Sequence, residues 1–249
     1  MALNINSAFR IHSLITALPS ANDSTQVLEV WSQLFDITEP NPIKKATAVT
    51  ERLMWVNKEL EIAHLQLKKS TFSTSLYEVP ISQLENAFSP MLLNAQWHSV
   101  RQYFAPDTLK ALAFCIEVLP DEEANITSEH LGELYARIEE LEVFLENSNL
   151  PVRLQTLIRR HLSLIRQALA EYPIAGAKAL LEARRAAYGE FFEVTEVFTE
   201  DSSAEVSKLK EVWSTLNKII DGAIKIDGLA QIAEKNWPLL RNLLEKLNN

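Results

Sequence analysis

Histidine and carboxylate side chains are the groups in this sequence that could bind a metal ion or transfer a proton. Glu61 and His64 stand three residues apart, a spacing that places both side chains on one face of a helix. Di-iron helical bundles use two such Glu-x-x-His motifs and two further carboxylates, whereas this sequence has one motif. A single cysteine also excludes the cysteine-based zinc spacings. The sequence therefore predicts no metal site and no cofactor.

Two potential catalytic side chains, His161 and Cys115, stand in apolar surroundings. A histidine near the middle of an apolar helical face is more often a core residue with a hydrogen-bond partner than a catalytic base. Cys115 lies in "LAFCIEVL" and is more typical of a small core residue than of a nucleophile. Arg153 and His161 are spaced more widely than the arginine and histidine of HEPN-type nucleases. No catalytic residue is predicted, and an enzyme with an unrecognised site near His161 or Glu61 and His64 remains an alternative.

Four arginines in residues 150–172 border an apolar stripe and do not form one basic face. At about 100° per residue, Arg153 and Arg160 fall on one flank of the stripe and Arg159 and Arg166 on the other. The stripe itself consists of Leu154, Leu157, Ile158, Ile165, Ala168 and Tyr172. This distribution is typical of a helix that packs by its apolar face and presents charges beside it.

The segment before these arginines has the opposite charge. Residues 121–149 contain nine acidic residues and, among lysine and arginine, Arg137 alone. The short connection "ENSNLP" predicts an antiparallel helical hairpin over 128–172, with Glu146 facing Arg153 and Glu139 near Arg160. Each exposed pair should contribute at most about 1 kcal/mol. The alternative for Arg159 and Arg166 is a role in binding a partner or an acidic ligand.

The pattern along the chain predicts an all-α protein of about nine helices. Apolar periodicity, capping residues and prolines place them at 2–18, 23–39, 43–70, 82–103, 107–120, 128–146, 150–172 and 174–198, followed by a helical region from 202 that Gly222, Gly228 and Pro238 interrupt. The helix over 43–70 is apolar on two sides, which is typical of a central helix. The polar stretch "PDEEANITS" predicts a boundary between a bundle at 1–120 and a helical part at 121–249.

Composition narrows the class of protein further. The 249 residues are 47% hydrophobic, carry a net charge of −9 and include five glycines and one cysteine. The negative charge argues against nucleic-acid binding, which needs a basic face. One cysteine permits no internal disulfide, and we expect a reducing, cytoplasmic location. No stretch approaches 18 apolar residues, so no transmembrane helix is predicted.

Two further segments are candidates for partner binding. The C-terminal stretch "VWSTLNKIIDGAIKIDGLAQIAEKNWPLLRNLLEKL" is amphipathic, and we expect it to pack on the body of the protein or on another subunit. Contact with a membrane surface is the alternative, although such helices are usually more basic. "YGEFFEVTEVF" is aromatic and acidic. The predicted partner-binding residues are Arg159, Arg166, Phe191, Phe192 and Trp237.

Residues 150–190, "LPVRLQTLIRRHLSLIRQALAEYPIAGAKALLEARRAAYGE", resemble a segment of uncharacterised bacterial helical proteins, some of them from mobile or anti-phage defence loci. The resemblance implies a bacterial regulatory or accessory subunit of a defence or toxin system and names no catalytic residue. With the missing catalytic motifs and the acidic charge, it favours a non-enzymatic protein-interaction subunit. A helical effector that acts at membranes after activation is the second hypothesis.

Overall fold

The computed structural model describes residues 4–187 and 204–224 of the chain. These residues form helices and connections and contain no β-strand, so the predicted all-α class is confirmed. The chain divides into two compact units. The first consists of residues 1–122 with 173–175, and the second of 123–172 with 176–249. Within the described ranges, no helix is both long enough and apolar enough to cross a membrane.

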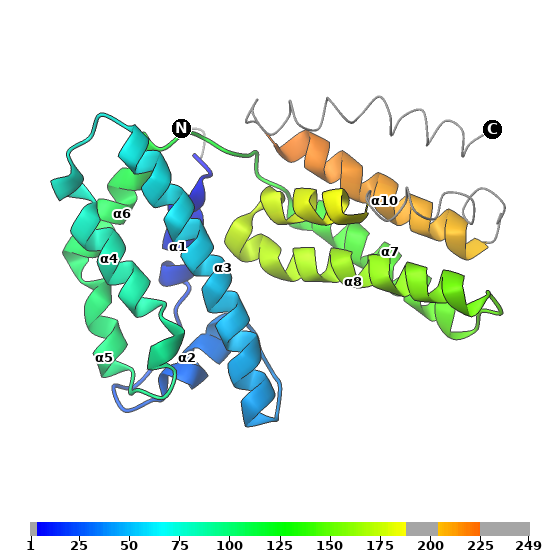
Figure 1. Cartoon of the computed structure of the whole chain (residues 1–249), viewed down its shortest axis with the longest axis horizontal. Coiled ribbons are helices and arrows are strands. Elements are labelled where there is room, and N and C mark those ends of the chain that lie inside the picture. The colour runs from blue at the N-terminus through cyan, green and yellow to red at the C-terminus, as the bar shows by residue number, and fades with distance from the viewer. Residues whose placement is uncertain (1–3, 188–203, 225–249) are drawn as a thin grey trace. The chain divides into compact units, whose positions relative to one another are not determined.

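The first unit packs five helices of eight or more residues around a single apolar core (Figure 1). They are α1 (Ser7–Thr16), α2 (Val27–Leu34), α3 (Pro42–Lys69), α4 (Glu78–Ala87) and α6 (Pro106–Val118). Shorter pieces connect them, namely η1 (Thr74–Leu76), η2 (Pro90–Leu92), α5 (His98–Arg101) and η3 (Gln102–Phe104). The indole of Trp31 lies at the centre of an aromatic group, with ring contacts to Phe35, Phe88, Trp97 and Phe104.

Helix α3 begins with a side-chain cap. The Asn41 side chain accepts hydrogen bonds from the first free N–H groups of the helix, and Pro42 occupies the first turn, where its missing N–H costs nothing. One of the two apolar sides expected for this helix carries Val49, Leu53, Val56, Leu60 and Leu67, and all five side chains are fully buried. The second apolar side is only partly covered, because Met54 and Leu65 remain 62% and 51% exposed while Trp55 packs against the core. α3 is therefore fully buried on one face only.

Two sequence predictions for the first unit are wrong. The expected helix over 82–103 is broken, because α4 ends at Ala87 and Asn57 donates a side-chain hydrogen bond to the carbonyl of its C-cap residue, Phe88. Pro90 then starts η2. The helix expected over 23–39 also begins later, at Val27, and the carboxylate of Asp23 lies 2.9 Å from the guanidinium of Arg101. Contacts with segments far away in the sequence override the local signals in both places.

The second unit is built on the predicted antiparallel hairpin (Figure 1). Helix α7 (Ser128–Glu146) is capped by Thr127 and has the predicted bounds, and α8 (Val152–Ala175) returns beside it. Residues 177–187 are helical, and α10 (Ala204–Ala223) runs antiparallel to α7. The buried residues Leu134, Ile138 and Leu141 of α7, Ile158 and Ile165 of α8, and Leu209, Val212 and Leu216 of α10 contribute to the core of this unit.

The end of α8 differs from the prediction that Pro173 separates two helices. Pro173 lies inside α8, where it removes one hydrogen bond near the end, and the helix continues to Ala175. The chain then turns at Gly176, whose φ of 67° and ψ of −155° are essentially restricted to glycine.

Gly222 was expected to interrupt the last helical region but lies within α10. The predicted breaks at Gly228 and Pro238 lie outside the described residues.

Candidate functional site

The first unit exposes a group of large apolar side chains where α3 is joined to α4. Phe72 follows the end of α3, Leu76 ends η1, Val79 lies in the first turn of α4, and Phe114 lies on α6. Their exposed fractions are 37%, 50%, 63% and 38%. The rings of Phe72 and Phe114 meet edge to face with 5.5 Å between their centroids. We call these four residues the apolar surface.

Local hydrogen bonds and one buried anchor hold this surface in place. The hydroxyl of Ser70, which caps α3, accepts a hydrogen bond from the N–H of Phe72 at 3.3 Å. Tyr77 is 1% exposed and fixes the start of α4 in the core. The connection is therefore anchored at both ends, and Phe72, Leu76 and Val79 face solvent from an ordered backbone.

A side-chain pair between α3 and α4 flanks the apolar surface. His64 Nε2 lies 2.9 Å from the carboxylate of Glu78. The hydrogen bond from His64 is the largest cause of the lowered pKa of Glu78, with smaller contributions from the charges of His64 and Lys68. Lys68 and Lys69 are exposed in the last turn of α3, so a positive edge borders the apolar residues.

The two residues of the Glu-x-x-His motif have different surroundings. His64 contacts Glu78 of α4, and Glu61 is exposed on α3. Within the described residues, no three histidine, cysteine or acidic side chains are grouped to hold a metal ion.

His161 is a buried core residue in the second unit, as the sequence indicates. It is fully buried, and its Nδ1 accepts a hydrogen bond from the indole N–H of Trp213 at 3.1 Å. Burial, with a smaller effect from the charge of Arg160, lowers the pKa of His161 to about 4. The imidazole is therefore neutral at pH 7 and carries its proton on Nε2.

Cys115 also lies in the core. It is 2% exposed, and burial raises the pKa of its thiol to about 11. A thiol with so high a pKa is a poor nucleophile at neutral pH, which agrees with the structural interpretation.

The hairpin forms an ion pair that differs from the two predicted pairs. Arg166 donates from Nε and Nη2 to the two carboxylate oxygens of Glu142, at 2.7 and 2.5 Å. The predicted pairs Glu146 with Arg153 and Glu139 with Arg160 are not formed. Gln155 donates hydrogen bonds to the carbonyls of Ser148 and Leu150, which holds the connection against the first turn of α8.

Of the five predicted partner-binding residues, the structure describes Arg159 and Arg166. Arg166 is half exposed and bound to Glu142. Arg159 is exposed on α8, close enough to contribute to the lowered pKa of Glu142. Phe191, Phe192 and Trp237 lie outside the described residues.

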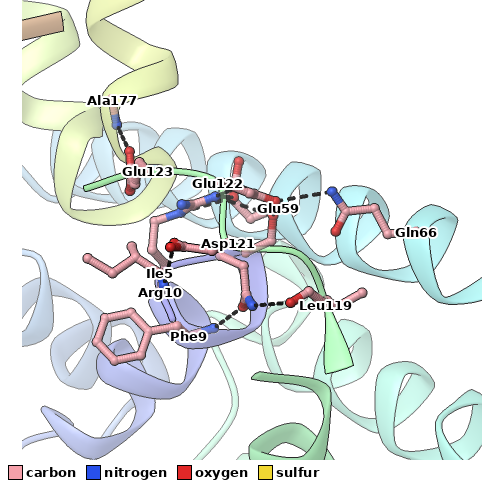
Figure 2. Close-up of polar contacts among 12 residues, drawn as sticks. Ile5, Phe9, Arg10, Glu59, Gln66, Leu119, Asp121, Glu122, Glu123 and Ala177 are labelled. Atoms are coloured by element: carbon pink, nitrogen blue, oxygen red, sulfur yellow. Dashed lines mark hydrogen bonds and ion pairs between the residues drawn. The ribbon is translucent and has the colours of Figure 1, made fainter. Parts of the chain in front are cut away.

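A buried ionic cluster in the first unit was not predicted (Figure 2). Arg10 Nη2 lies 2.6 Å from Glu59 and 2.5 Å from Glu122, and the three side chains are at most 5% exposed. Ser7 and Gln66 each donate a hydrogen bond to Glu122. The cluster joins α1, α3 and the segment after α6. Both carboxylates bind Arg10, so the role of the cluster is structural.

Comparisons of the chain with protein-family models, with curated proteins and with solved structures found no match.

The residues of the apolar surface were not predicted from the sequence. Phe72 and Leu76 stand in the Ser- and Thr-rich stretch "STFSTSL", where polar residues are normal for a connection. Two large apolar residues in such a stretch were the signal that could have identified them.

Proposed function

We propose that this chain is a non-enzymatic protein-interaction subunit that binds its partner through the apolar surface. The observation that carries the proposal is the exposure of Phe72, Leu76, Val79 and Phe114 on anchored backbone. Aromatic and aliphatic side chains of this kind form the centre of protein interfaces. Binding would remove them from water, which favours association by roughly 25 cal/mol per Å² of apolar area.

The charges beside the surface indicate the chemistry of the partner. Lys68 and Lys69 supply positive charge at its edge, and the His64 side chain is already engaged by Glu78. A partner helix with apolar residues on one face and acidic residues on its flank complements this arrangement. Acidic flanks would steer the encounter and set orientation, while the apolar contacts would supply most of the affinity.

The test is purification of the tagged protein and of a double variant, Leu76→Glu with Val79→Glu. Both positions are at least half exposed, so the variant should fold, and buried acidic charges at an interface are costly. We expect a stoichiometric protein partner to co-purify with the unchanged chain and to be lost, by at least about tenfold, with the variant.

Met91 offers a matched control, because it is a 92% exposed apolar side chain of the same unit outside the apolar surface. Met91→Glu should retain the partner. Equal loss of the partner from both variants, or equal retention by both, would refute the role of the apolar surface. Co-purification with lipid alone and leakage of liposomes would instead favour the alternative of a membrane effector.

A bacterial defence or toxin system is the proposed context, and the cytoplasm the proposed location. The context rests on the resemblance of residues 150–190, and the location on the single cysteine, which permits no internal disulfide. The identity of the co-purified partner tests the context, since a partner encoded outside such a system would contradict it.

A further inference from the structure

The second unit contains a cavity of about 260 Å³ between the start of α7 and the end of α10. Its lining combines polar side chains, among them Asn125, Thr215 and Lys218, with the apolar side chains of Ile126 and Ile219. Drug-sized ligands occupy cavities of roughly 300–1,000 Å³, so this one suits a small molecule with one polar head and a short apolar body.

The charges around the cavity favour an anionic head. Lys218 is exposed and forms no ion pair within the described ranges. The carboxylate of Glu133 lies 2.9 Å from Arg137, which neutralises it in place. The first turn of α7 adds the positive end of a helix dipole, and its His130 N–H is capped by Thr127.

A hydroxyl on the wall of the cavity adds a hydrogen-bonding group. Thr215 lines the cavity and is 8% exposed. A hydroxyl can both donate and accept a hydrogen bond, so it can donate to a ligand oxygen.

The cavity also contains open space beside Gly222 of α10. Gly222 lines the cavity, and a Cβ at this position would meet nothing within 4 Å. Because glycine weakens a helix interior by about 1 kcal/mol relative to alanine, its presence in the last turn of α10 leaves room beside Ile219 at a cost in stability. Ile126 and Ala223 complete an apolar floor.

We propose that this cavity binds a small carboxylate with a short branched apolar body. Lys218 and the Asn125 amide hold the carboxylate near the start of α7, Thr215 donates a hydrogen bond to it, and the apolar body lies against Ile126 and Ile219. Loss of one charge-assisted hydrogen bond should weaken binding by about tenfold or more.

The experiment is an NMR titration of the full chain that follows the backbone amide signals of Thr215 and Gly222. The probes are isovalerate, its neutral isostere isovaleramide, and acetate, which lacks the apolar body. We expect isovalerate to bind with a millimolar or lower Kd, and the amide and acetate to bind at least about tenfold more weakly. Lys218→Gln should lose the preference for the carboxylate over the amide.

Lys210→Gln is the matched control, because Lys210 lies on the same helix and does not line the cavity. Gly222→Leu fills the cavity and should abolish binding while its amide spectrum elsewhere shows an intact fold. Equal binding of acid and amide, unchanged binding by Gly222→Leu, or no shift up to about 5 mM isovalerate would each overturn the proposal. These readouts do not involve the apolar surface, so they are independent of the proposed function.

Discussion

The indole N–H of Trp213 donates a hydrogen bond to Nδ1 of His161, and the two rings meet nearly at right angles with 5.6 Å between their centroids. The contact joins α8 to α10 inside the core of the second unit. It also fixes the imidazole in the neutral form, because a protonated ring cannot accept at Nδ1.

We expect the second unit to become less stable as the pH falls from about 6.5 to about 4. The unfolded chain protonates His161 at about 6.5, whereas the folded pKa is about 4, so only the unfolded state gains a proton in this window. Stability is therefore complete above pH 6.5 and decreases below it, by up to about 3 kcal/mol. Urea unfolding at several pH values should show this dependence reduced in His161→Gln and unchanged in His98→Gln, which alters an exposed histidine. If stability falls equally with pH in the unchanged chain and in both variants, His161 is not the source of the pH dependence.

Arg10→Met should destabilise the first unit by about 3–5 kcal/mol, because it removes the cation shared by two buried carboxylates. Chemical unfolding measures the change. Arg137→Met is the control, since Arg137 pairs with Glu133 and Glu211 near the protein surface and should cost no more than about 1 kcal/mol. Similar losses of unfolding free energy in both variants would show that the buried Arg10 cluster contributes no more to stability than the pairs of Arg137 do.

Gly176→Ala should cost at least about 2 kcal/mol, since the backbone conformation is restricted to glycine. A Cβ at Gly176 would also collide with the Glu123 carboxylate, which accepts a hydrogen bond from the Ala177 N–H at 2.5 Å. Gly222→Ala makes the matched comparison, because that glycine is helical with open space around it, and alanine there should stabilise by up to about 1 kcal/mol. Thermal unfolding should move the two midpoints in opposite directions, and a shift of the same sign would refute the explanation.

The pair of Glu142 and Arg166 should give a modest coupling free energy in a double-mutant cycle. Both side chains are about 40% exposed, and screened pairs of this kind contribute about 0.2–1 kcal/mol. The variants are Glu142→Gln, Arg166→Met and their combination. Since the hydrogen bond from Arg166 lowers the pKa of Glu142, the coupling should be present at pH 7 and disappear as Glu142 protonates at acid pH. A coupling that survives protonation would mean that packing, and not charge, joins the two side chains.

The sequence by itself determined the helical class, the hairpin of α7 and α8 and the core stripe of α3. These features follow from the spacing of apolar residues and from capping residues such as Asn41 and Thr127, which act within a few residues of themselves. His161 was also recognisable as a core residue from its place on an apolar face. Local periodicity carries this information because it fixes which side chains share one face of a helix.

Only the tertiary structure decided which residues meet across elements. Arg10 contacts Glu59 and Glu122, which are 49 and 112 positions away, and nothing in the periodicity of α1 indicates that its arginine is buried. The exposure of Met54 and Phe72, the choice of Glu142 by Arg166 and the cavity beside Gly222 were likewise settled by packing. Each depends on the relative position of two or more helices, which the spacing of residues within one helix does not specify.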